Sequence, residues 1–311
     1  MSLALLFPGQ GSQSVGMLAD LADHWPQVAE TFAQASEVLG YDLWQLVHNG
    51  PAEALNQTDK TQPAMLAAGV AVARVWQAAG GAIPTAMAGH SLGEYTALVC
   101  AEALGFEDAI KLVEKRGQLM QSAVPAGEGA MAAILGLSDE DVIALCEAAA
   151  QGDVVEAVNF NSPGQVVIAG TRSAVERATE IAKEKGAKRA LLLPVSVPSH
   201  CSLMKPAADE LAKVLDAIEI SAPTIKVIHN ADVQSHQDGA SIKKALVEQL
   251  YNPVRWVETI GALKNAAVET VVESGPGKVL AGLNKRIDRR MTALPVFDDA
   301  SLKKALEATQ Q

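Results

Sequence analysis

The chain has 311 residues, of which 49% are hydrophobic and 20% are charged, and its formal net charge is −11. This length allows one large domain or about two ordinary ones, each with a substantial core. The negative charge argues against nucleic acid as a partner, because phosphate contacts need clustered Lys and Arg, and apolar runs such as residues 64–72 are too short for a membrane span.

The first predicted element is a strand over residues 3–7, which leads into the loop Pro8-Gly9-Gln10-Gly11-Ser12-Gln13. Glycine-rich loops after strands are where α/β folds place their sites.

No basic segment or cleavage site precedes the strand, so we expect no signal peptide and a cytoplasmic protein. Three widely spaced cysteines suit neither a disulfide framework nor a zinc site, so we expect no metal.

Ala-rich helical stretches follow to about residue 79, then a strand over 85–89 and helices over 93–101 and 107–122. Between that strand and the next helix lies Gly89-His90-Ser91-Leu92-Gly93, a G-x-S-x-G pattern that holds a serine hydroxyl exposed on a strained turn. The backbone N–H of Leu92, at a helix N-terminus, is placed to bind an oxyanion. We therefore predict that Ser91 is a nucleophile, and the alternative is an ordinary tight turn.

A serine nucleophile needs a neighbouring base, and histidine is the usual one. His200, in a loop after a predicted strand, and His229, at the end of the predicted strand 225–228, are the two candidates among six histidines. Their spacing favours His200 and leaves His229 open. We find no Asp or Glu in the later half of the chain that would orient the base, which argues against a simple hydrolase.

Arg116 lies on the apolar stripe of the helix 107–122, four residues from both Leu112 and Met120. It should point inward, where an unpaired guanidinium is very costly. The sequence leaves two possibilities open. The anion is either a structural Asp or Glu, or the carboxylate of a substrate held through two parallel hydrogen bonds.

Short alternating elements between residues 125 and 194 predict an inserted subdomain. The expected elements are a strand at 130–137, a helix from Ser138 capped with Asp141, strands at 154–159 and 165–170, a helix opened by a Ser173/Glu176 capping box, and a strand at 189–193. This β-α-β-β-α-β order is ferredoxin-like. We predict an insert at residues 127–195, with residues 1–126 and 196–311 forming the larger subdomain.

The later part returns to larger alternating elements. We expect a helix at 202–217, a strand at 225–228, helices at about 240–250 and 255–265, and a strand at 270–273. The turn Ser274-Gly275-Pro276-Gly277 then leads into the last main helix.

Five ordered motifs along the whole chain resemble one family, the bacterial malonyl-CoA:acyl carrier protein transacylases of type II fatty acid synthesis. The motifs are Pro8-Gly9-Gln10-Gly11-Ser12-Gln13, Gly89-His90-Ser91-Leu92-Gly93-Glu94-Tyr95, Val197-Pro198-Ser199-His200, Asn252-Pro253-Val254-Arg255-Trp256 and Gly275-Pro276-Gly277. The resemblance implies an α/β fold with an α/β-hydrolase-like large subdomain around a parallel sheet, carrying the ferredoxin-like insert.

The resemblance also implies roles for individual residues. Ser91 would carry the malonyl ester, His200 would be the base, and the backbone carbonyl of Gln249 would orient it. The N–H groups of Gln10 and Leu92 would form the oxyanion hole. Arg116 would bind the malonyl carboxylate.

The implied reaction is ping-pong transfer from malonyl-CoA to the phosphopantetheine thiol of an acyl carrier protein. Coenzyme A enters as part of the substrate, so we expect no cofactor, and we expect a monomer.

The carrier protein is expected to be acidic, so an acidic enzyme needs a local positive surface for docking. Between residues 278 and 290 the net charge is +4, and its basic members are Lys278, Lys285, Arg286, Arg289 and Arg290. We interpret this group as a carrier docking patch. The alternative is a solvated helix face.

Three other functions remain open. A serine esterase or thioesterase would use the same nucleophile and oxyanion donors, although Arg116 and the missing acid argue against it. A non-catalytic carrier-binding or scaffold protein could keep the fold. A discrete acyltransferase of a polyketide assembly line would share every catalytic residue.

Overall fold

The computed structural model describes residues 2–195 and 197–309, so residues 1, 196, 310 and 311, which include one predicted subdomain boundary, lie outside the described residues. Its larger sheet has five parallel strands in the order β7-β2-β1-β8-β9. The strands are β1 (Leu3–Phe7), β2 (Ala86–Gly89), β7 (Lys226–Ile228), β8 (Thr270–Ser274) and β9 (Thr292–Val296). The predicted α/β fold with a parallel sheet is confirmed.

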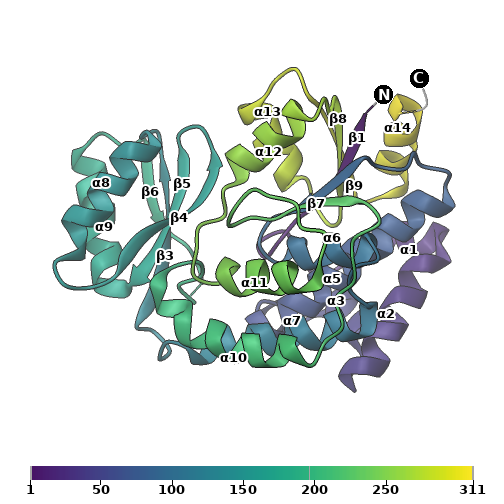
Figure 1. Ribbon diagram of the computed structural model, residues 1–311, viewed down its shortest axis with the longest axis horizontal. Helices are drawn as coiled ribbons and strands as arrows, with labels where there is room; N and C mark the ends of the chain where they lie inside the picture. Colours follow the sequence, from purple (N-terminus) through teal and green to yellow (C-terminus); the bar gives the residue numbers. More distant parts are fainter. Residues whose placement is uncertain (1, 196, 310–311) are drawn as a thin grey trace.

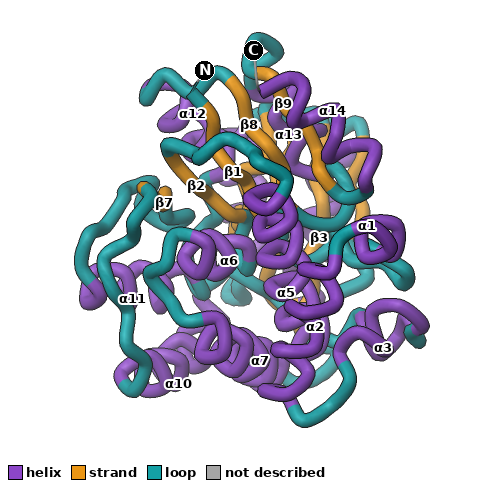
Figure 2. The backbone as a smooth tube through the Cα atoms, turned by 90° about the vertical axis from the view of Figure 1, so that its right-hand side faces the viewer, coloured by secondary structure: helices purple, strands orange, loops and turns teal. Residues whose placement is uncertain are grey.

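Helices cover both faces of this sheet, which explains why β1 and β8 are buried along their whole length. In β1, Leu3, Leu5 and Phe7 face one core, and Ala4 and Leu6 face the other. Figure 2 shows β2, β1, β8 and β9 side by side, with α5 and α6 packed near them.

The helices that pack on the first core come from the parts of the chain before and after the antiparallel sheet, up to the C-terminal helix. They are α1 (Ala19–His24), α2 (Pro26–Leu39), α3 (Leu43–Asn49), α4 (Ala52–Leu55), α5 (Thr58–Ala78), α6 (Gly93–Cys100), α7 (Phe106–Ser122), α10 (Lys205–Asp216), α11 (Gly239–Gln249) and α14 (Asp299–Thr309). The second core lies under α12 (Trp256–Asn265) and α13 (Val279–Ile287). A short 3-10 helix, η1 (Ser202–Met204), precedes α10.

The second sheet is antiparallel and lies beside the first, on the left of Figure 1. Its order is β4-β5-β3-β6, and its strands are β3 (Gly129–Leu135), β4 (Val155–Ser162), β5 (Gln165–Thr171) and β6 (Arg189–Leu192). Helices α8 (Asp139–Ala150) and α9 (Arg172–Glu184) pack on one face of it. The ferredoxin-like order is therefore confirmed, whereas the boundaries at 127 and 195 stay a prediction.

The start of α9 differs from the prediction. Thr171, the last residue of β5, is the N-cap of α9, so the strand runs directly into the helix and Ser173 already lies inside it. The Ser173 hydroxyl donates to Asp153 Oδ2 at 3.1 Å. The predicted capping box of Ser173 and Glu176 is wrong because the N-cap position is Thr171, which places Ser173 inside the first turn of the helix. The other predicted cap is present, since Ser138 Oγ accepts from Asp141 N at 3.1 Å.

The C-terminal part contains two elements that the sequence did not suggest, β9 and α14. α13 is therefore not the last main helix. β9 contains Pro295, which cannot donate a ladder hydrogen bond, and this residue is tolerated because β9 is an edge strand. Across the described ranges 2–195 and 197–309, no helix is long and apolar enough to cross a membrane.

Candidate active site

Ser91 lies in the turn between β2 and α6 with a φ of +51°, in the left-handed region. The two flanking glycines are required by close backbone contacts. A Cβ on Gly89 would lie 1.9 Å from the carbonyl carbon of Gly93, and a Cβ on Gly93 would lie 2.0 Å from the backbone oxygen of Phe7. The G-x-S-x-G pattern therefore marks a tight nucleophile elbow.

His200 is the histidine that reaches the serine. Its Nε2 lies 2.8 Å from Ser91 Oγ, and its Nδ1 lies 2.7 Å from the backbone oxygen of Gln249. A carbonyl can only accept, so Nδ1 carries the proton and Nε2 turns its lone pair toward the hydroxyl. Burial, with a further contribution from Arg116, lowers the pKa of His200 to about 3. His200 is therefore neutral at physiological pH and able to accept a proton.

Arg116 reaches the same hydroxyl from α7. Its Nη2 donates to Ser91 Oγ at 3.2 Å and to Gln249 Oε1 at 2.9 Å, and its Nη1 donates to Gln62 Oε1 at 2.8 Å. Only 1% of the residue is exposed, and burial lowers the pKa of its guanidinium. In residues 2–195 and 197–309 no Asp or Glu forms an ion pair with it, so the alternative of a directly paired structural carboxylate is not met, although the Glu94 carboxylate is linked to it through the Gln249 amide.

Gln10 and Leu92 come to the same edge of the sheet. Phe7 of β1 pairs with Gly89 of the parallel strand β2. Gln10 lies three residues after Phe7 and Leu92 three residues after Gly89, so both leave the sheet at the same edge. The two loops touch, because a Cβ on Gly9 would lie 2.5 Å from the backbone oxygen of His90. Neither the Gln10 nor the Leu92 N–H has an acceptor among the described residues. Both are free to donate to a developing oxyanion.

His229 does not serve as the base. Its Nδ1 lies 2.8 Å from Glu94 Oε1, and both side chains are completely buried. Burial by itself would lower the pKa of His229, but the Glu94 carboxylate raises it above its ordinary value. His90 also points away from the hydroxyl, with Nε2 2.8 Å from Asn161 Oδ1.

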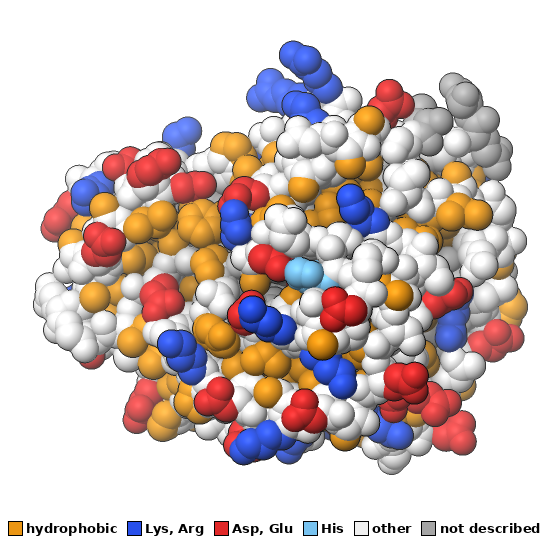
Figure 3. All heavy atoms as spheres, viewed as in Figure 1, with side chains coloured by type: hydrophobic (Ala, Val, Ile, Leu, Met, Phe, Trp, Pro, Cys, Tyr) orange, Lys and Arg blue, Asp and Glu red, His pale blue; other side chains and the backbone are white. Residues whose placement is uncertain are grey.

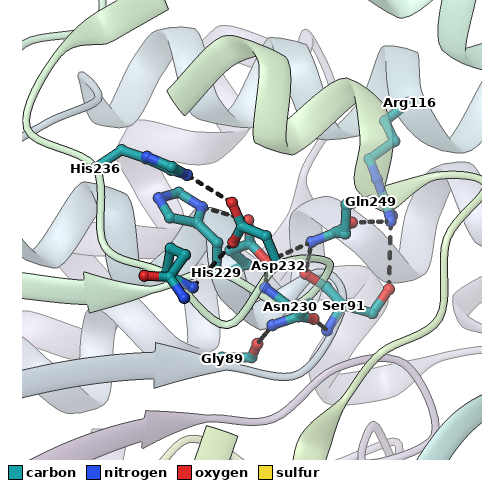
Figure 4. A network of polar contacts seen from close by, with 10 residues as sticks. Gly89, Ser91, Arg116, His229, Asn230, Asp232, His236 and Gln249 are labelled. Atoms are coloured by element: carbon teal, nitrogen blue, oxygen red, sulfur yellow. Dashed lines mark hydrogen bonds and ion pairs between the residues drawn. The ribbon is translucent and has the colours of Figure 1, made fainter. Parts of the chain in front are cut away.

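Four residues that hydrogen-bond within or around the site were not predicted from the sequence: Gln62, Glu94, Asn161 and Asn230. Gln62 begins the apolar part of α5, and a buried amide there is a detectable signal, since buried polar groups need partners. Asn230 accepts from Ser91 N at 2.7 Å and, in Figure 4, lies on the Gly89 side of the serine, opposite Arg116 and Gln249. No local pattern indicates this contact, because 139 residues separate its partners.

The basic residues at 278–290 are not part of the catalytic cluster. Lys278, Lys285, Arg286, Arg289 and Arg290 are all exposed, on α13 and the segments next to it. Figure 3 shows Lys and Arg side chains projecting from the top of this face. Arg286 Nη1 donates to Gln165 Oε1 of β5 at 2.7 Å. The preceding turn reaches the site loops, since a Cβ on Gly275 would lie 2.8 Å from Pro8 Cγ.

The arrangement can perform covalent acyl transfer, because a neutral base and a cation contact the Ser91 hydroxyl, and the two free N–H groups lie in adjoining loops at the same edge of the sheet. Within the described part of the chain, no group of three or more His, Cys, Asp and Glu is placed to hold a metal ion.

Residues 4–291 match the acyl transferase domain family. The malonyl CoA-acyl carrier protein transacylase of Haemophilus influenzae is 61% identical over 96% of this chain and 96% of its own, and that of Escherichia coli is 59% identical over 98% of each. The chain belongs to the malonyl CoA-acyl carrier protein transacylase family.

Solved structures of the malonyl CoA-acyl carrier protein transacylase family have the same fold. The Coxiella burnetii protein superimposes with a TM-score of 0.99 at 54% identity and covers 100% of this chain and 98% of its own. A malonyl-transacylase in complex with its type II PKS acyl-carrier protein gives a TM-score of 0.98 at 59% identity, over 99% of this chain and 100% of that one.

Proposed function

We propose that this chain is a malonyl-CoA:acyl carrier protein S-malonyltransferase of fatty acid biosynthesis. The observation that indicates the substrate is the buried guanidinium of Arg116, which contacts Ser91 Oγ. Its other partners are the neutral amide oxygens of Gln62 and Gln249, where a structural role would need a carboxylate. A malonyl thioester brings the missing carboxylate. Membership of a transacylase family favours transfer over the esterase alternative.

In the first half-reaction, neutral His200 Nε2 takes the Ser91 proton as Oγ attacks the thioester carbonyl carbon. The oxyanion accepts hydrogen bonds from the N–H groups of Gln10 and Leu92, each worth about 3 kcal/mol in such sites. The C–S bond then breaks, and the sulfur leaves as coenzyme A with the proton from His200. A malonyl ester remains on Ser91.

In the second half-reaction, the carrier's phosphopantetheine thiol enters. His200 takes the thiol proton, the sulfur attacks the ester carbonyl, and the oxyanion again forms against Gln10 and Leu92. When the C–O bond breaks, the proton returns to Ser91 Oγ and malonyl leaves as a thioester. The Gln249 carbonyl stabilises the protonated form of His200 in both halves through its contact with Nδ1.

The carrier would dock on the basic patch Lys278, Lys285, Arg286, Arg289 and Arg290. All five side chains are exposed, and the turn before α13 packs against the loop that contains Gln10. The acidic balance of the rest of the chain fits neither nucleic acid nor an anionic membrane surface as a partner. We take the enzyme to be a cytoplasmic monomer that uses no cofactor beyond the coenzyme A of its substrate.

The decisive experiment incubates the protein with malonyl-, methylmalonyl- and acetyl-CoA and measures acylated Ser91 by mass spectrometry. Carrier protein is then added and the transfer followed. We expect a malonyl adduct on Ser91 that disappears as malonyl carrier forms, and no adduct with Ser91→Ala. Steady hydrolysis without a transferable adduct would favour the thioesterase alternative, and no adduct at all would favour the scaffold.

A polyketide carrier is the second candidate acceptor. The observation that favours it is the relative with 59% identity that was solved with a type II PKS acyl-carrier protein. Comparing kcat/KM for a fatty acid carrier and a type II polyketide carrier separates the two roles.

A further inference from the structure

Beneath the elbow lies a buried carboxylate that the reaction does not use. Glu94, in the first turn of α6, is 0% exposed. Its Oε1 lies 2.8 Å from His229 Nδ1, and its Oε2 accepts from Asn230 N at 2.8 Å and from Gln249 Nε2 at 2.9 Å. Burying a carboxylate is costly unless donors surround it, and three donors do so here. We call Glu94, His229, Asn230 and Gln249 the Glu94 network.

Through Asn230 the network reaches the nucleophile. The Asn230 side chain accepts from Ser91 N at 2.7 Å and donates to Gly89 O at 2.7 Å, so one carboxamide bridges the elbow. Ser91 has a φ of +51°, a conformation that non-glycine residues adopt at a cost. Asn230 therefore holds the serine in a conformation that its own backbone disfavours.

Through Gln249 the network reaches Arg116. Gln249 Nε2 donates to Glu94 Oε2 and to Ser91 O at 2.9 Å each, so both amide hydrogens are used. The remaining Oε1 accepts from Arg116 Nη2. An ionised carboxylate only accepts and a guanidinium only donates, so the amide between them has one possible orientation. Figure 4 shows Gln249 between Arg116 on one side and His229 and Asn230 on the other.

We propose that Glu94 is a positioning residue with two separable effects, on the geometry of Ser91 through Asn230 and on the selection of a carboxylated acyl group through Gln249 and Arg116. The selectivity part rests on the proposed function. Glu94 touches no reacting atom. Together with Ser91 O it anchors the Nε2 side of the Gln249 amide, which keeps Oε1 in contact with the Arg116 guanidinium.

The test compares single-turnover acylation of Ser91 by malonyl-CoA and by acetyl-CoA, without carrier protein. In Glu94→Gln the shape is kept but the negative charge that accepts from Gln249 Nε2 is lost, so the amide that positions Arg116 is held less firmly. We expect the malonyl-to-acetyl rate ratio to fall about tenfold, the effect of losing one charge-assisted contact. In Asn230→Ala both rates should fall by the same factor, which leaves the ratio unchanged.

Glu273→Gln is the matched control. Glu273 is also a buried carboxylate, 1% exposed, but its oxygens accept from the backbone N–H groups of Leu280 and Ala281 in α13. It should lower the melting temperature without changing the ratio. In a double-mutant cycle with Arg116→Ala, Glu94→Gln should change the ratio no further, because the two act through one relay.

A wild-type ratio in folded Glu94→Gln would overturn the proposal, as would an equal ratio change in Glu273→Gln. If Glu94→Gln does not fold, Gln249→Leu interrupts the same connection between Glu94 and Arg116. A wild-type malonyl-to-acetyl ratio in that variant would also overturn the proposal. Failure of the proposed function gives a different result, since wild-type protein would then form no malonyl adduct on Ser91 that can be transferred to carrier protein.

Discussion

The hydroxyl of Ser91 is contacted by a base and by a cation in the free protein. His200 Nε2 lies 2.8 Å away and Arg116 Nη2 lies 3.2 Å away. In the proposed function, the first contact would make the oxygen nucleophilic, and the second would place positive charge where an entering acyl group carries its carboxylate. Gln62 and Gln249 hold the guanidinium through neutral oxygens, so its charge remains available to a substrate.

Replacing Arg116 with Ala should reverse the acyl preference. We expect kcat/KM for malonyl-CoA to fall roughly 100-fold or more, the cost of losing a buried charge-assisted pair. Activity on acetyl-CoA should rise, because acetyl does not need the charge. Steady-state kinetics on both donors measures this, with Lys213→Ala on the exposed face of α10 as a control. Equal loss on both donors would contradict the carboxylate role.

The pH dependence of acylation should reflect the buried state of His200. Its pKa, lowered to about 3, keeps the imidazole neutral far below the ordinary value for histidine. We therefore expect the single-turnover rate with malonyl-CoA to show no inflection between about pH 5 and pH 8, in contrast to an ordinary histidine near 6.5. A loss of rate with an apparent pKa near that value, in protein that remains folded, would contradict this interpretation.

Helix α13 presents the basic patch in a fixed direction. Its N-terminus is held by the buried carboxylate of Glu273, which accepts from Leu280 N and Ala281 N at 3.0 and 2.8 Å. Negative charge at this end of a helix and basic residues in its last turn, here Lys285 and Arg286, both suit the helix dipole. The patch therefore combines an internal anchor with an exposed cationic end.

Reversing the charge of Lys285 and Arg286 to Glu should weaken carrier docking. We expect KM for carrier protein to rise about tenfold, with KM for malonyl-CoA unchanged, because steering charges act mainly on association. The matched control reverses Lys183 on α9 and Lys185 at its C-cap, which are exposed and change the net charge equally. An equal rise in both variants would assign the effect to net charge, and no rise in either would refute the patch.

The site depends on how the two sheets are joined. β4 is linked to the segment before α12 by hydrogen bonds from Phe160 N to Val254 O at 3.0 Å and from Val254 N to Val158 O at 2.8 Å. Nearby, the His90 ring next to the nucleophile contacts Asn161 of β4. The elbow and the antiparallel sheet are therefore held in one arrangement.

The stability of the whole molecule should depend on pH through His229. Its pKa is raised by Glu94 despite burial, so its contribution is complete below the unfolded value of about 6.5 and is lost as pH rises through the folded pKa. We expect the free energy of unfolding to exceed that of His229→Gln at low pH and the difference to shrink above about pH 6.5. Urea denaturation across this range measures it. A constant difference would mean that the pair is not ionised.

The sequence alone was sufficient for much of the architecture. The order of the short elements at 130–193 predicts the ferredoxin-like sheet. Gly89 and Gly93 predict the elbow, because a Cβ at either position would lie about 2 Å from neighbouring backbone atoms, which leaves no room for a side chain. Apolar periodicity also placed Arg116 inside the fold. These features depend on local spacing, which is visible in one chain. The role of the Gln249 carbonyl came from resemblance to a family, since a backbone oxygen leaves no mark in sequence.

The tertiary structure decided which buried group pairs with which. His200 and His229 both follow predicted strands, but only His200 meets Ser91, while His229 meets Glu94. Arg116 has Gln62 and Gln249 as partners, from helices 54 and 133 residues away in sequence. Hydrogen bonds require approach to about 3 Å in a defined direction. That condition is set by the packing of distant elements, and no periodicity along the chain encodes it.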